Sequence, residues 1–236
     1  MKKRVNPKSM TEIVAKKMLF RLLLVALLSV LLTGLGYAIL SLPSQAPGLS
    51  QAVMKNLETS GVSNPVTAVL INFRAYDTLM EMAVLLLALL GVWSLGGEPE
   101  QRESSPDPVL DMLPRLLVSV LILVAGYLLW DGGHAPGGAF QAGSVLGAVG
   151  VLLLLAGWHP GARLVRLPLR IALVAGLGMF VVMGIILILM GRRFLEYPPS
   201  LAGAMILLIE STATLSIAIT LASLFLGGRP NSGAHK

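Results

Sequence analysis

Ionisable side chains are rare within the apolar stretches of this sequence, and those that occur there are the first candidates for chemistry. Glu210 is the single charged residue of the apolar run Leu201–Leu226, and Thr214 follows it by one helical turn. A carboxylate this far from both ends of a spanning helix lies near the middle of the bilayer, where ionisable groups are costly and usually functional. The hydroxyl of Thr214 can solvate a carboxylate or hydrogen-bond a neighbouring helix. We therefore interpret Glu210 and Thr214 as candidates for ion or proton translocation, with helix packing as the alternative role of Glu210.

A second group of charges opens the apolar stretch that ends near Leu95. Arg74, Asp77 and Glu81 are three and four residues apart, which places them on one face of a helix. Charges at membrane depth face protein or water, because burial in lipid costs about 2.5 kcal/mol or more. Two carboxylates beside an arginine can hold and pass a proton or a sodium ion. The alternative for Arg74 and Asp77 is an ion pair that anchors the helix at the membrane surface.

A glycine-rich turn is the third candidate site. The segment DGGHAPGGAFQAG places four glycines around a proline, at Gly132, Gly133, Pro136, Gly137 and Gly138. Such a turn permits backbone conformations that other residues resist, and its exposed amides can bind an anion or let another backbone approach closely. His134 can relay protons near neutral pH, or it can simply lie in solvent.

The residues that follow this turn suggest close helix packing. Gln141 is predicted to be a buried hydrogen-bonding residue just inside the next helix. Gly143 and Gly147 form a GxxxG spacing, which favours close approach of a second helix.

The composition that surrounds these residues is that of an integral membrane protein. Of the 236 residues, 55% are hydrophobic and 13% are charged, whereas soluble domains average about 25% charged residues. The absence of cysteine excludes a disulfide-stapled secreted domain, iron–sulfur groups and thiolate-bound metals. No nucleotide-binding, zinc-protease or haem motif occurs. The sequence therefore predicts a protein that is not an enzyme, with no cofactor and no nucleic-acid partner.

Six apolar segments reach the roughly 20 residues that a spanning helix needs. They are Met18–Leu40, Tyr76–Leu95, Val109–Trp130, Ala139–Trp158, Ile171–Met190 and Leu201–Leu226. The first is longer than the apolar region of a cleaved signal peptide, so we interpret it as an anchor. The stretch Asn64–Leu95 exceeds one crossing, and its start is expected to lie along the membrane surface. The predicted fold is all-α, an integral membrane bundle of about six transmembrane helices.

Basic residues flank these segments unevenly. With six spans, fourteen lysines and arginines fall on the side of the N-terminus and three on the opposite side, with Arg74 left out of the count. An excess of basic residues marks the cytoplasmic side. Both termini are therefore predicted in the cytoplasm, with the chain in the inner (plasma) membrane.

A polar stretch rich in charge and proline divides the chain. It reads as a linker because it cannot form an apolar core. We predict a two-span module at residues 1–96, a polar linker at 97–110, a four-span module at 111–228 and a tail at 229–236. No internal repeat of the kind found in inverted-repeat carriers is evident.

Both halves contain motifs that resemble known membrane proteins. PGGAFQAG, followed by an apolar helix, resembles the PGGGFQ(A/G)G signature of the B subunit of Mrp-type Na+/H+ antiporters, the MnhB family. The run LLIESTATLSIAIT is similar to the last helix of that family, which has an acidic residue in the same setting. Upstream, VLINFRAYDTLMEMAVLLLALLGV resembles the C-terminal end of the large Mrp A subunit and a small subunit of membrane-bound hydrogenases.

The resemblance assigns importance to particular positions. Nine residues occupy positions that are characteristic of the motifs of these families. They are Arg74, Asp77, Glu81, Pro136, Gly137, Gly138, Phe140, Gln141 and Glu210. The sequence departs from the family patterns at Ala75-Tyr76, where Gly-Phe is common, and at Met80 and Ala139, where glycines are common. Met80 puts a close helix approach in question, and Ala139 questions a requirement for positive φ at that position.

The resemblance implies a membrane subunit of a multi-subunit monovalent cation (Na+)/proton antiporter complex. Its partners would be the other subunits, the lipid bilayer, Na+ and H+. The ion would pass along polar side chains between helices, with Glu81 and Glu210 as the main candidates. One alternative is the ion-pumping module of a membrane-bound hydrogenase or related ferredoxin-driven respiratory complex. Another is a structural scaffold subunit without an ion path.

Overall fold

The structure is a computed structural model that describes residues 7–42, 48–95, 108–158 and 167–227. Within these ranges every regular element is a helix, which confirms the all-α prediction for the described part of the chain. Most of the predicted linker, residues 97–107, and the predicted tail lie outside the described residues. Contacts divide the chain into two units, Met1–Leu49 and Ser50–Lys236.

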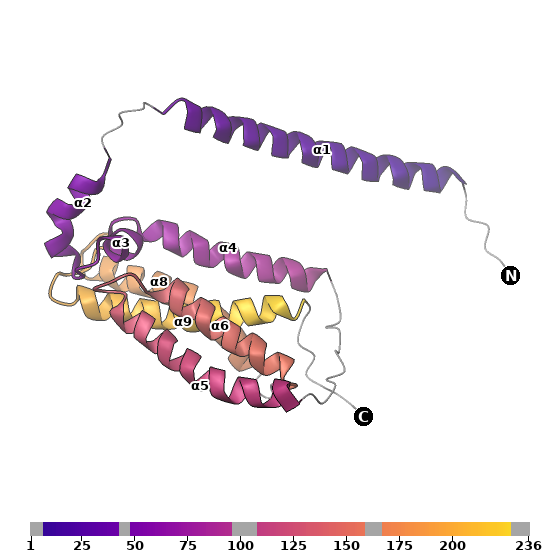
Figure 1. The fold of residues 1–236 in the computed structure, drawn as a ribbon. Coiled ribbons are helices and arrows are strands. Elements are labelled where there is room, and N and C mark those ends of the chain that lie inside the picture. Colours follow the sequence, from indigo (N-terminus) through magenta and orange to yellow (C-terminus); the bar gives the residue numbers. More distant parts are fainter. Residues whose placement is uncertain (1–6, 43–47, 96–107, 159–166, 228–236) are drawn as a thin grey trace. The chain divides into compact units, whose positions relative to one another are not determined.

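The first unit contains a single long helix, α1 (Pro7–Leu40) (Figure 1). Its part Lys16–Leu40 is long and apolar enough to cross a membrane. Large apolar side chains are exposed along this part, from Met18 to Leu40. Within its own unit α1 therefore has the surface of a helix that contacts lipid or another protein.

The second unit begins with short helical pieces and continues into five long helices. The short pieces are α2 (Ser50–Asn56), the 3₁₀ turn η1 (Leu57–Ser60), α3 (Pro65–Thr67) and the π-helix η2 (Ala68–Phe73). The long helices are α4 (Ala75–Ser94), α5 (Pro108–Asp131), α6 (Ala139–Leu155), α8 (Leu167–Leu189) and α9 (Ala202–Phe225). These five helices match the predicted segments to within a few residues, and α1 contains the sixth but begins at Pro7, before the predicted start at Met18.

Four helices of the described chain meet the length and hydropathy of a membrane span. They are Lys16–Leu40, Ala75–Ser94, Leu167–Leu189 and Ala202–Phe225. The apolar helix Ala139–Leu155 and the apolar part of α5, Leu116–Asp131, are shorter. The α6 helix is short because it begins beside Glu210, about two turns into α9, instead of level with the start of α9.

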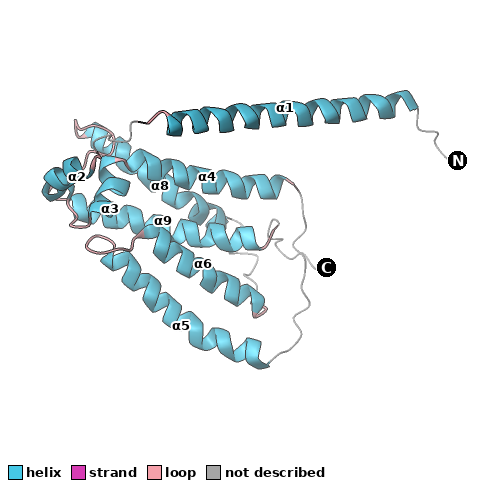
Figure 2. Cartoon of the chain, turned by 45° about the horizontal axis from the view of Figure 1, so that its top comes forward, coloured by secondary structure: helices cyan, strands magenta, loops and turns pink. Residues whose placement is uncertain are grey.

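The α9 helix lies at the centre of the second unit and packs against α4, α5, α6 and α8 (Figure 2). Three glycines of α6, Gly143, Gly147 and Gly150, allow the closest of these contacts. A methyl group on Gly143 would lie 2.8 Å from Ile217 Cβ, and one on Gly150 would lie 2.9 Å from Ala222 Cβ. The GxxxG spacing therefore lies at the α6–α9 contact, which confirms its predicted role in close packing.

The helical stretch Asn64–Leu95 is interrupted at Arg74. In η2 the backbone turn is wide, and the Arg74 N–H donates to Val69 O at 2.7 Å. Arg74 itself has φ −128° and ψ 36°, so α4 starts afresh at Ala75. The Thr78 hydroxyl donates to Leu70 O at 2.6 Å and so satisfies a carbonyl next to the break. The stretch Asn64–Leu95 is thus divided into two pieces, and π-helical turns of this kind are frequent at functional sites.

We expect Gly143→Ala to destabilise the protein more than Gly126→Ala. The added methyl group at Gly143 meets Ile217, and overpacking of this kind costs about 1–3 kcal/mol. Gly126 on α5 has open space around it, so alanine there should be neutral or slightly stabilising. Thermal unfolding of the two variants in detergent measures the difference. Equal midpoints would contradict the proposed tightness of the α6–α9 contact.

Candidate functional site

Glu210 is the one acidic side chain that is buried among the described residues, with 4% exposure. The backbone N–H of Ala139, the first residue of α6, faces its carboxylate, and Oε1 of that carboxylate lies beside Gly138. The residue that caps α6 is Gly138, which has no side chain to accept a bond from the first N–H groups of the helix. The Glu210 carboxylate of α9 therefore lies at the N-terminus of α6, at the positive end of the α6 dipole.

Gly138 is required here both for its conformation and for its lack of a side chain. Its φ of 101° lies in the region that favours glycine. A methyl group on Gly138 would come within 2.7 Å of Glu210 Oε1. The group that lies next to Gly138 is thus the Glu210 side chain. Ala139 does not have positive φ, so alanine in place of the third glycine of the family motif fits the start of α6.

Thr214 shares the buried face of Glu210 but does not donate to its carboxylate. The Thr214 hydroxyl is 2% exposed and donates to the backbone carbonyl of Glu210 at 2.7 Å, with Ala139 O at 3.5 Å. The Ser216 hydroxyl also donates to a backbone carbonyl, that of Leu173 in α8, at 2.6 Å. These hydrogen bonds favour a packing role for the α9 hydroxyl groups.

The turn before α6 is covered by the segment that precedes η2. The backbone N–H groups of Ser63 and Asn64 both donate to Gly133 O at 3.0 Å. The Asn64 side-chain amide donates to Ala135 O, and the Thr67 hydroxyl donates to Gly132 O. The carbonyl groups of Gly132, Gly133 and Ala135 in this irregular backbone thereby have partners inside the protein, as a membrane environment requires.

Sequence reasoning missed Asn64 and Thr67. The Asn64 side chain also caps α3 by accepting from Val66 N at 2.9 Å, with Pro65 in the first turn. An asparagine followed by proline is a recognisable start signal for a helix and would have directed attention to this segment.

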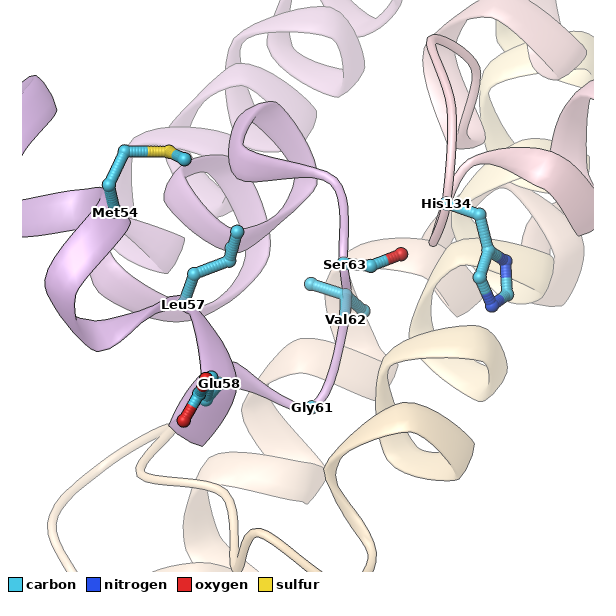
Figure 3. A pocket seen from close by; sticks show the side chains of 7 residues that line it. All are labelled: Met54, Leu57, Glu58, Gly61, Val62, Ser63 and His134. Atoms are coloured by element: carbon cyan, nitrogen blue, oxygen red, sulfur yellow. The ribbon is translucent and has the colours of Figure 1, made fainter.

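His134 lies at the edge of an open hollow of about 490 Å³. The hollow is lined by Met54, Leu57, Glu58, Gly61, Val62, Ser63 and His134 (Figure 3). Glu58 and His134 lie on opposite sides of it, so they do not form an acid–base pair (Figure 3). The His134 side chain is exposed, which favours the solvent-exposed alternative.

The prediction that Gln141 is buried is wrong, because its side chain is exposed. The face of α6 that meets α9 is fixed by Gly143 and the glycines that follow it. Gln141 precedes Gly143 by two residues, about 200° of helix rotation, and therefore lies outside that contact. The neighbouring Phe140 is partly buried against the apolar core, whereas Pro136 is exposed.

The three charges near the start of α4 form a separate group. Arg74 and Asp77 make an ion pair at 2.5 Å, with side chains 61% and 48% exposed. Glu81 is also exposed, whereas α4 buries Ala75, Thr78, Met82 and Leu89. Asp77 and Glu81 thus share the exposed face of α4, whereas Arg74 precedes the helix and contacts Asp77 through the ion pair. Among the described residues no ion pair or hydrogen bond joins this group to Glu210.

With this geometry in view, comparison with known proteins identifies two family regions. Residues 109–227, half of the chain, match the family described as a domain related to the MnhB subunit of Na+/H+ antiporter. The chain belongs to this family. Residues 18–100 match a second family, described as the E subunit of MBH. Together with its apolar helices, this membership makes the chain a multi-pass membrane protein.

Individual relatives agree with the family assignment. An uncharacterized protein of Methanocaldococcus jannaschii is 29% identical over 133 residues, which are 47% of this chain and 49% of that protein. The chain thus spans about half the length of this curated relative. A chain of the membrane-bound sulfane sulfur reductase, an archaeal respiratory membrane complex, matches with a TM-score of 0.63 and 21% identity, over 89% of this chain and 97% of that chain.

A second solved structure shares the fold over nearly the whole sequence. A chain of the Mrp complex from Dietzia sp. DQ12-45-1b matches with a TM-score of 0.60 and 22% identity, over 99% of this chain and 27% of that chain. At identities this low, both structures establish a common fold.

We expect Gly137→Val to impair assembly or activity more than His134→Ala. A side chain at Gly137 would meet the backbone oxygen of Leu128 at 2.4 Å, so the turn would have to open. His134 is exposed and its loss leaves the backbone of the turn unchanged. The yield of assembled complex from membranes, followed by transport assays, compares the two variants. Negligible effects of both would show that the turn is a passive connection.

Proposed function

We propose that this chain is a membrane subunit of a multi-subunit monovalent cation/proton antiporter complex. The observation that carries the proposal is the buried carboxylate of Glu210 at the N-terminus of α6, within the MnhB-related region. Intramembrane carboxylates are expensive and commonly belong to ion or proton paths. Helix N-termini inside membranes are also recurring elements of transporter sites.

In this proposal protons or Na+ ions pass along polar side chains of this subunit and its partners. Glu210 is the buried exchange group, with Thr214 beside it and His134 in the turn above. Asp77 and Glu81, with Arg74, lie on the outer face of α4. A charged face on an apolar helix is costly in lipid, so a partner subunit is expected to continue the path there.

We further propose six spans with both termini in the cytoplasm. The two shorter apolar helices, α5 and α6, would cross together with the segments that extend or cover them. The modules would be residues 1–96 and 111–228, joined by the polar linker 97–110. The asymmetry of basic residues supports this orientation.

The orientation is testable with an introduced cysteine in a chain that has none of its own. We expect Ser232→Cys to resist an impermeant thiol reagent added to intact cells and to react after the membrane is opened. A cysteine at Lys55, Lys55→Cys, should show the opposite pattern. Labelling of position 232 from outside would refute the cytoplasmic C-terminus.

A redox-driven respiratory complex is the second candidate setting. It is favoured by the likeness to one chain of the sulfane sulfur reductase complex. The match covers 97% of that chain. Copurification from native membranes, followed by identification of the subunits, distinguishes the two settings. Antiporter-type subunits alone support the first setting, and iron–sulfur subunits in addition support the second.

We expect Glu210→Gln to abolish or strongly slow coupled ion transport while the complex still assembles. Glutamine keeps the size of the side chain, and its oxygen can still accept from Ala139 N–H, but it cannot release a proton or carry charge. Transport in everted vesicles and the yield of purified complex measure the two effects. Ser211→Ala, which removes a hydroxyl bonded to its own helix at Leu207 O, is the matched control.

Normal transport by an assembled Glu210→Gln complex would reduce Glu210 to a helix cap. The structural scaffold interpretation of this chain would then be favoured.

A further inference from the structure

Two side-chain oxygens lie near Gly138, one from a buried residue and one from an exposed residue. A methyl group on Gly138 would lie 2.7 Å from Glu210 Oε1 and 4.0 Å from Gln141 Oε1. Glu210 is buried and Gln141 is exposed. The two oxygens therefore lie near one another, one on a buried side chain and the other on an exposed one.

Helix geometry explains why Gln141 reaches this position. It is the third residue of α6, and side chains on a helix lean toward its N-terminus, here toward Gly138. A glutamine at this position often bonds back to the N–H of the capping residue. In this protein the Gly138 N–H already donates to Leu128 O at 2.9 Å. The amide of Gln141 is thus available for other hydrogen bonds.

The neighbours of Glu210 on α9 differ from Gln141 in polarity and in hydrogen bonding. On α9 its neighbours Ile209 and Ala213 are buried and apolar, and the Thr214 hydroxyl donates to a backbone carbonyl. The α6 helix contains no charged residue, and the acidic residues of α4 lie on its exposed face. Gln141 is thus the exposed polar side chain that shares the space beside Gly138 with Glu210.

We propose that Gln141 is the access residue of Glu210, through which the buried carboxylate exchanges protons or ions with the surface of α6. The missing side chain of Gly138 keeps the passage between them open. The transport meaning of this access route rests on the proposed function of Glu210, but the route itself is a statement about accessibility. Gln141 is in this view a positioning residue that holds water or a partner group next to the carboxylate.

Carboxyl modification tests the route directly. The complex in native membranes is treated with a water-soluble carbodiimide and an amine, and mass spectrometry measures the modification of Glu210, with the exposed Glu58 as internal reference. Gln141→Leu should slow Glu210 modification about fivefold or more, as expected for the loss of one hydrogen-bonding step. Gln141→Asn, which keeps an amide, should retain part of the wild-type rate.

The matched control is Ser144→Ala on the same helix. Ser144 is exposed and its hydroxyl donates to Gln141 O at 2.9 Å, so its loss should leave the modification rate unchanged. Wild-type rates in Gln141→Leu would overturn the proposal. So would the absence of Glu210 modification in wild-type complex under conditions that modify Glu58.

The experiment separates this inference from the proposed function. If modification slows in Gln141→Leu while transport is normal, the access route stands and the transport role of Glu210 fails. If Glu210→Gln abolishes transport while Gln141→Leu leaves modification unchanged, the transport role stands and the access route fails.

Discussion

The placement of the buried Glu210 carboxylate at the first N–H groups of α6 is the constraint on which the rest of this bundle depends. A helix that starts within a membrane protein exposes N–H groups that water cannot satisfy. Gly138 permits the approach but provides no cap, so the acceptor has to come from α9. The carboxylate lies at the level where α6 begins, and the glycines further along α6 hold this helix against α9.

The same constraint explains the segment that covers the turn. Because α6 begins about two turns into α9, the irregular backbone of Gly132–Gly138 precedes it and has carbonyl groups that need donors. Ser63, Asn64 and Thr67 supply these donors from a part of the chain 65 to 71 residues earlier. The break at Arg74 follows from this arrangement, because the chain must leave the turn before it can enter α4. Cap, turn, covering segment and break thus form one connected set.

Much of this arrangement was predictable from the sequence, and each failure has a physical cause that residue types do not reveal. Apolar length predicts the six helices, and the isolated charge in the last span identifies Glu210. The exposure of Gln141 was not predictable, because α6 is apolar on all sides and its rotation is fixed by glycines that meet α9. Asn64 and Thr67 were missed because their acceptors are backbone carbonyls, which leave no pattern of residue types at the other end.

The contact between Ser63–Thr67 and the turn also bears on how such a chain evolves. Its acceptors are backbone oxygens of Gly132, Gly133 and Ala135, so side chains of the turn are free to vary wherever space and conformation allow. The contact needs no peptide bond between the two family regions, which match separately at residues 18–100 and 109–227. The contact between the two modules can therefore form whether one gene encodes both modules or each module has a gene of its own.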